Sequence, residues 1–138
     1  MRAYWGSKQV KQGRGRAAVK VDFHGRSFGS KLEAAVYGVL LLREKAGEIS
    51  EIHCQSTVRM YSNAMGEHWG CRPDFRCTNP DGSIFYVEAK GFEQDRWKGT
   101  RFIWSLLGPA PMEVWKGSYK RPMLAETIPA GELIKKEE

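Results

Sequence analysis

A predicted β-hairpin in the middle of the chain constrains the fold more than any other feature of the sequence. Two runs of strand-forming residues, 71–78 and 84–89, flank the turn sequence Pro80-Asp81-Gly82. A three-residue loop with its glycine in the left-handed conformation fixes the pairing register of both strands. In this register Asp74 lies opposite Glu88, and directly opposed residues have Cβ atoms about 4.5–5.5 Å apart. The sequence therefore predicts two carboxylates side by side on one face of a sheet.

The residues around Glu88 indicate what such a pair is for. Lys90, two residues further along the strand, points to the same face. Two adjacent carboxylates repel each other unless a hard cation lies between them, and Mg²⁺ is the usual cation. The apolar run 84–87 predicts a strand that is covered on both faces, where an acid and an ammonium without a function are costly. Gly91 lets a phosphate approach closely. We expect a metal-dependent site that hydrolyses phosphate esters.

Two further residues each have a structural and a functional interpretation. Ser30-Lys31-Leu32-Glu33 matches the capping box, in which Glu33 bonds back to the N-cap amide. Alternatively, Glu33 points into the site as a further metal or water ligand. Gln55, expected in mid-strand among apolar neighbours, either orients water or a phosphate or is a satisfied core amide.

The charge distribution favours a polyanionic partner. The formal net charge is +6, and residues 1–31 hold eight Lys or Arg against the single acid Asp22. A basic arm ahead of an acidic site suits a phosphate-rich ligand, because neutralising phosphates releases counterions. The alternative is a solvated surface that serves solubility. We expect residues 1–20 to form a flexible basic arm. Its candidate phosphate contacts are Lys11, Arg14, Arg16 and Lys20.

Composition also limits the class of protein. At 138 residues the chain is most simply one domain. It has no apolar run of membrane-helix length, and its basic, glycine-rich start lacks the apolar region of a signal peptide, so we expect a cytosolic protein without a membrane partner. The three cysteines have no short paired spacing, which disfavours a disulfide framework and structural zinc. Cys71 and Cys77 are expected to face the interior of a strand.

The pattern of elements predicts an α/β fold with a mixed β-sheet flanked by helices. After a small hairpin over 21–28, the expected order is helix, three strands, helix, strand. The helices are expected at 30–46 and 94–107, and the strands at 49–58, 71–78, 84–89 and 112–115. Beyond Ser118 the signals weaken, so residues 121–138 are expected to be a C-terminal tail.

The second predicted helix carries charged and aromatic residues. Lys98 and Arg101 share one face of it, where they hold DNA phosphates or form its solvated side. Trp97, Phe102 and Trp104 are expected in the core rather than as platforms for stacked bases.

Residues 21–107 resemble the PD-(D/E)xK nuclease superfamily. The resemblance rests on Pro73-Asp74-Phe75, on Val87-Glu88-Ala89-Lys90-Gly91 and on Glu33 in a preceding helix. Within this superfamily the sequence is most similar to small phage-encoded proteins of the Holliday-junction-resolvase-like branch. The residues that carry this similarity are 21–34, Gly47-Glu48-Ile49 and Gln55. The connection 60–72, rich in His, Trp and Gly, departs from the family pattern.

This resemblance implies a restriction-endonuclease-like core within a nuclease domain over 21–120. It implies that Glu33, Asp74 and Glu88 bind Mg²⁺, or Mn²⁺ in its place, and that Lys90 positions or activates water. The implied activity is a metal-dependent, structure-selective DNA endonuclease that acts on branched DNA such as Holliday junctions during recombination. Because such an enzyme makes two symmetric cuts, a homodimer is expected. The alternatives are a DNA-binding accessory protein without turnover, and an RNA-directed or general end-degrading nuclease.

Overall fold

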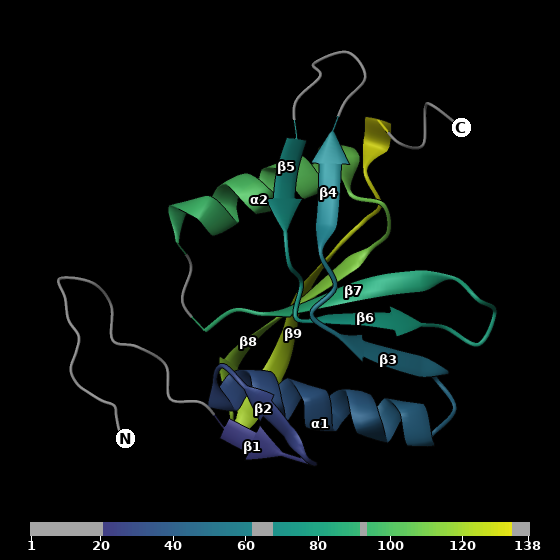
Figure 1. Ribbon diagram of the computed structural model, residues 1–138, viewed down its shortest axis with the longest axis vertical. Helices are drawn as coiled ribbons and strands as arrows, with labels where there is room; N and C mark the ends of the chain where they lie inside the picture. Colours follow the sequence, from purple (N-terminus) through teal and green to yellow (C-terminus); the bar gives the residue numbers. More distant parts are fainter. Residues whose placement is uncertain (1–20, 62–67, 92–93, 134–138) are drawn as a thin grey trace, which may run out of the picture.

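The computed structural model describes residues 21–61, 68–91 and 94–133 (Figure 1). In chain order the elements are β1 (Val21–Phe23), β2 (Arg26–Phe28), α1 (Lys31–Lys45), β3 (Glu51–Cys54), β4 (Val58–Tyr61), β5 (His68–Cys71), β6 (Phe75–Thr78), β7 (Ile84–Ala89), α2 (Asp95–Leu107), β8 (Met112–Ser118) and β9 (Arg121–Ile128). A five-stranded sheet has the order β3-β6-β7-β8-β9, in which only β7 and β8 are parallel. The predicted α/β class with a mixed sheet is confirmed.

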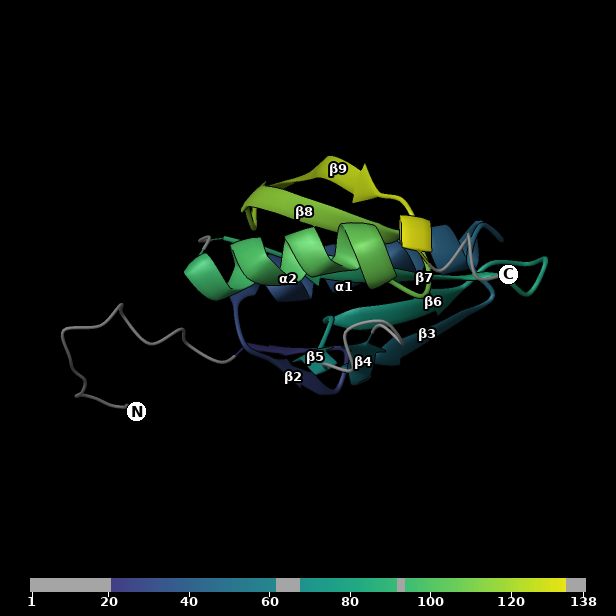
Figure 2. The ribbon, with the colours of Figure 1, turned by 90° about the horizontal axis from the view of Figure 1, so that it is seen from above.

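The two helices cover opposite faces of the five-stranded sheet. Figure 1 shows α1 on one side of β3, β6 and β7, and α2 on the other, with the β4–β5 hairpin beside α2; Figure 2 shows the arrangement from above. The hairpin is joined to α2 by a hydrogen bond from Trp69 Nε1 to Thr100 Oγ1 at 2.9 Å. Each face of the sheet therefore has its own apolar core.

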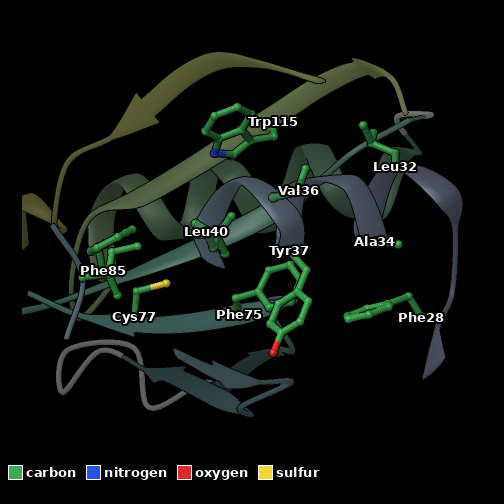
Figure 3. Close-up of a cluster of buried hydrophobic side chains, with 12 residues drawn as sticks. Phe28, Leu32, Ala34, Val36, Tyr37, Leu40, Phe75, Cys77, Phe85 and Trp115 are labelled. Atoms are coloured by element: carbon green, nitrogen blue, oxygen red, sulfur yellow. The ribbon is translucent and has the colours of Figure 1, made fainter. Parts of the chain in front are cut away.

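The core under α1 is built on helical periodicity. Val36 and Leu40 are fully buried in one cluster with Phe75 of β6 (Figure 3). Val87 of β7 belongs to the same cluster. Tyr37 stacks on Phe75 with ring centroids 5.6 Å apart. The predicted helix is confirmed, with Ser30 as its N-cap and Gly47 at φ +84° just beyond it.

The second core lies between α2 and the sheet. Trp104 is fully buried and its Nε1 donates to the Ala110 carbonyl oxygen at 2.8 Å. Trp97 is also buried, as expected, whereas Phe102 is 61% exposed and its assignment to the core is wrong. Cys77 is fully buried in the α1 core, as expected for an inward-facing strand residue.

The register of the β6–β7 hairpin is the predicted one. Phe75 pairs with Val87, so Asp74 lies opposite Glu88 at the next position. At the turn, the Asn79 N–H donates to the Ser83 carbonyl at 2.7 Å, and the glycine of the loop has φ +92°. A residue with a side chain would be strained in that conformation.

The predicted order of elements is not matched, because a second hairpin interrupts the expected strands. The strand expected over 49–58 ends at Cys54, and Gln55 turns the chain with φ +55°. The chain then forms β4 and β5 on the α2 face and re-enters the sheet at β6. The strand expected over 71–78 is therefore split between β5 and β6.

The C-terminal part also differs from the expectation. Residues 121–128 were expected in a tail, but they form β9 and pair with β8 along its length. Pro122 is tolerated because β9 is an edge strand. The predicted strand at 112–115 is confirmed and continues to Ser118.

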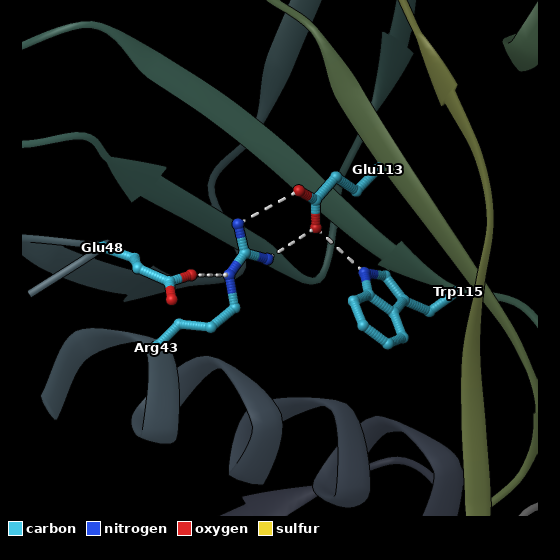
Figure 4. A network of polar contacts seen from close by, with 4 residues as sticks. All are labelled: Arg43, Glu48, Glu113 and Trp115. Carbon is cyan, nitrogen blue, oxygen red and sulfur yellow. Dashed lines mark hydrogen bonds and ion pairs between the residues drawn. The ribbon is translucent and has the colours of Figure 1, made fainter. Parts of the chain in front are cut away.

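A polar network fixes α1 against the sheet (Figure 4). Arg43 donates from both terminal nitrogens to Glu113 of β8, at 3.0 and 3.3 Å. Trp115 Nε1 donates to the same carboxylate at 3.0 Å, and Glu48 lies 3.6 Å from Arg43 Nε. A two-pronged pair of this kind restricts the position of the helix along β8.

Candidate active site

The carboxylates of Asp74 and Glu88 are brought together at the end of the β6–β7 hairpin. Glu88 Oε1 accepts the Asp74 N–H at 3.1 Å, and Asp74 Oδ2 accepts the Ala89 N–H at 2.8 Å. Glu88 is buried, with 8% of its surface exposed. Each acid is thus held by the backbone of the opposite strand, which restricts both side chains without neutralising their charge.

Lys90 supplies the positive charge nearest to this pair. Its Nζ lies 2.9 Å from Glu88 Oε2 and 5.0 Å from the centroid of the Trp97 ring. The ion pair and the aromatic ring hold the ammonium at one side of the acidic pair. The predicted common face of Glu88 and Lys90 is therefore present.

Glu33 combines a capping position with an electrostatic influence on the site. Its N–H donates to the side-chain oxygen of Ser30 at 3.0 Å, which is one half of the predicted capping box. Its carboxylate accepts a hydrogen bond from the backbone of Gly29. Burial and then the charge of Glu88 raise the pKa of Glu33, so its carboxylate is influenced by the acidic pair.

The electrostatics of the site show an excess of negative charge. Burial, then Glu88, then Glu33 raise the pKa of Asp74 to about 8, against smaller opposing effects of the Ala89 amide and Lys90. Burial also raises the pKa of Glu88, although Lys90 opposes it. One ammonium does not balance the three carboxylates, and a further cation would relieve their repulsion.

The residues present fit a magnesium ion. Mg²⁺ keeps several of its waters and is held by one or two carboxylates together with substrate phosphates, so Asp74 and Glu88 suffice as protein ligands. The Ala89 N–H is hydrogen-bonded to only one of the two carboxylate oxygens of Asp74, Oδ2, so the other oxygen can face an ion. Within residues 21–61, 68–91 and 94–133, no three His, Cys, Asp or Glu side chains are grouped closely enough to hold a metal by themselves.

A pocket of about 210 Å³ adjoins Glu88 and Lys90 on the α2 side of the sheet. It is also lined by Arg72 of the β5–β6 connection and Arg96 of α2, which the sequence did not single out, and by Trp97, which was expected only as a core residue. The signal for Arg72 was its position two residues before Asp74. Nothing in the sequence indicated that Arg96 or Trp97 would line this pocket, since their place in the wall depends on how α2 packs.

Of the other predicted site residues, Gln55 contacts the acidic pair through its backbone, since its N–H donates to the Asp74 carbonyl oxygen at 2.8 Å. The remaining ones lie on α2 or outside the described residues. Gln55 is exposed at the end of β3, so its placement in mid-strand as a core amide is wrong. Lys98 is exposed on α2, and Arg101 is bound to Glu126 by two hydrogen bonds, at 2.8 and 2.5 Å. Lys11, Arg14, Arg16 and Lys20 lie outside the described residues.

Neither a protein-family model nor a curated protein nor a solved structure matches this chain. Neither of the two helices in the described part of the chain is long and apolar enough to cross a membrane. What the site does is therefore inferred from its own geometry and from the motif residues.

Proposed function

We propose that this protein is a Mg²⁺-dependent, structure-selective DNA endonuclease that hydrolyses phosphodiester bonds in branched DNA such as Holliday junctions. The observation that carries the proposal is the pair Asp74 and Glu88, held side by side at the open end of the β6–β7 hairpin, with Lys90 beside them. The same three residues carry the resemblance to PD-(D/E)xK nucleases. The raised pKa of Asp74, which burial and neighbouring acids cause, supports a site that is completed by a cation.

Each residue has a role in this mechanism. Asp74 and Glu88 would hold the ion, and Glu33, which is not grouped with them closely enough to be a third direct ligand, would orient a water. When bound, the divalent ion lowers the pKa of a coordinated water and polarises the scissile phosphate. Lys90, held at 2.9 Å from Glu88, offsets the negative charge that develops on the phosphate.

The expected substrate sets the wider features of the proposal. The basic arm, with Lys11, Arg14, Arg16 and Lys20, and the exposed Lys98 would contact DNA phosphates without reading bases. A homodimer would place two sites for symmetric cuts in a junction. For a phage-encoded enzyme of recombination, the place of action is the cytoplasm of the host cell.

The test is a nicking assay on labelled four-way junctions with Mg²⁺, Mn²⁺ or a chelator. We expect cleavage with either metal, none with chelator, and a loss of at least about 100-fold in Glu88→Gln with DNA binding retained. Glu51→Gln, which removes an exposed acid from the neighbouring strand β3, is the matched control and should cleave normally. Cleavage that is independent of metal, or equal in both variants, would refute the proposal.

A second candidate function is DNA binding without turnover. It is favoured by the engagement of the Glu33 carboxylate with Gly29 and by the lack of a three-ligand group within the described residues. An accessory protein would bind junctions but cut none with either metal. Offering linear DNA, branched DNA and RNA together also separates the junction-selective enzyme from a general or end-degrading nuclease.

A further inference from the structure

The pocket beside the acidic pair is lined mainly by hydrogen-bond donors. It lies between the end of β7, the β5–β6 connection and the first turns of α2. Its charged wall residues are the three cations Arg72, Lys90 and Arg96 and the single acid Glu88. The net charge of the pocket wall is therefore positive. The neighbouring acidic pair, in contrast, lacks enough positive charge to balance it.

Two of these cations are fixed in position. Arg96 Nη2 donates to the Gly70 carbonyl oxygen at 2.8 Å, and its guanidinium lies 4.8 Å from the centroid of the Trp69 ring. Neither contact neutralises the charge of Arg96. Lys90 is held by Glu88 and by the Trp97 ring. A charge that is already in place loses little side-chain entropy when it binds a ligand.

Trp97 is an independent indication that the pocket receives an acceptor. The residue is only 5% exposed and lines the pocket, and its indole Nε1 has no hydrogen-bond partner among the described residues. A buried donor without a partner costs free energy and calls for an explanation. Because Trp97 lines the pocket, an oxygen-rich anion bound there is the ligand that would supply an acceptor for this N–H.

The N-terminal end of α2 adds to the positive electrostatic potential of the pocket. Its N-cap, Gln94, lines the pocket and makes no side-chain hydrogen bond to the first turn of this 13-residue helix. The N-terminal end of a helix carries a partial positive charge and favours an anion. Cations from three segments, an unpartnered N–H and a helix N-terminus thus lie around one small space.

We propose that this pocket binds a backbone phosphate of the nucleic-acid substrate, next to the phosphate that is cut. The identity of the substrate rests on the proposed function, whereas the preference for a phosphate rests on the donors of the pocket. Arginine and lysine donors make strong charge-assisted hydrogen bonds with phosphate oxygens. A strand held there would present a neighbouring phosphate to Asp74 and Glu88.

The experiment measures binding without cleavage. The full chain is titrated, in chelator and over a range of salt concentrations, against a fluorescent single-stranded oligonucleotide and against a labelled four-way junction. Arg72→Gln should weaken binding about tenfold and reduce the slope of log K against log salt by about 1. Arg59→Gln removes the same charge from an exposed position of β4 outside the pocket, and should leave the slope unchanged.

A second variant guards against misfolding of the first. Gln94→Glu places a negative charge at the rim of the pocket in a position that the helix dipole favours, so it should fold and yet bind the oligonucleotide more weakly. Thermal melts establish that each variant is folded. Competition by inorganic phosphate should be weaker against both pocket variants than against the wild-type protein.

The outcomes separate this inference from the proposed function. If Arg72→Gln and Arg59→Gln behave alike, or if the wild-type protein binds neither ligand, the phosphate site is refuted. If junctions are cut but the pocket variants bind normally, the site fails and the nuclease stands. If the pocket variants bind poorly but no metal supports cleavage, the nuclease fails and the site stands.

Discussion

The side chains of Asp74 and Glu88 exchange hydrogen bonds with each other's strands. Glu88 Oε1 accepts the amide of Asp74 itself, and Asp74 Oδ2 accepts the amide of Ala89, the residue after Glu88. Neutral amides orient the carboxylates but leave their charges in place. Whenever both acids are ionised, repulsion between these two closely held groups therefore acts in the folded protein. It is absent from the unfolded chain, where the acids are hydrated and apart.

This repulsion predicts that the metal-free protein becomes less stable as the pH rises from about 5 to about 8.5. The folded-state pKa of Asp74 is raised to about 8, because of burial and the charge of Glu88. The stability that this group contributes is present below its unfolded pKa and is lost as the pH rises through about 8. We expect a loss on the order of 4 kcal/mol, measured by urea unfolding in chelator.

Asp74→Asn is the control for this pH dependence. It keeps an oxygen that can accept the Ala89 N–H but removes the charge, so the fall in stability over the same pH range should be much smaller. Added Mg²⁺ should restore stability to the wild-type protein at high pH and should not stabilise the variant. A wild-type profile that is flat from pH 5 to 8.5 would contradict the prediction.

The two roles of Glu33 can be separated with its partner in the cap. Ser30→Ala removes the acceptor of the Glu33 N–H and should cost about 1 kcal/mol of stability, with activity retained. Glu33→Gln relieves repulsion with Glu88, so it should not lower stability, but should reduce metal-dependent cleavage at least tenfold. Unfolding curves and cleavage rates of both variants check this. If Glu33→Gln cleaves DNA at the normal rate, Glu33 acts only in the cap of α1 and takes no part in catalysis.

The parts of the fold that could be predicted are those encoded by neighbouring residues. The register of the β6–β7 hairpin follows from a local turn, and the start of α1 from the Ser30 cap. The β4–β5 hairpin depends on the left-handed conformation of Gln55, which its residue type does not signal. β9 forms because it pairs with β8, despite Pro122. Such pairing is non-local and leaves little pattern in the sequence.

The candidate site divides in the same way. Asp74, Glu88 and Lys90 lie on one hairpin, so counting along two strands placed them together. The pocket beside them is built from β7, α2 and the β5–β6 connection, whose meeting depends on the packing of α2 against the β4–β5 hairpin. Residue spacing alone could not place Arg96 or Trp97 in its wall.

Lys98 and Arg101 are expected to behave differently although they lie three residues apart on α2. Arg101 makes two hydrogen bonds to Glu126 and lowers the pKa of that acid. Arg101→Gln should therefore cost about 0.5–1 kcal/mol at neutral pH and less at a pH below the lowered pKa. Lys98→Gln should leave stability unchanged and weaken DNA binding. If both variants weaken DNA binding equally and neither changes stability, Arg101 contacts DNA phosphates rather than stabilising the fold through Glu126.

Gly131 tests whether the segment after β9 belongs to the folded domain. Its N–H donates to the Gly108 carbonyl at 2.9 Å, and a Cβ on this residue would overlap the backbone carbonyl of Leu106 at the end of α2. Gly131→Ala should therefore cost about 1–3 kcal/mol in urea unfolding. Gly70→Ala is the matched control, because nothing lies within 4 Å of the added carbon. If Gly131→Ala is as stable as this control, the segment after β9 is not packed against the end of α2.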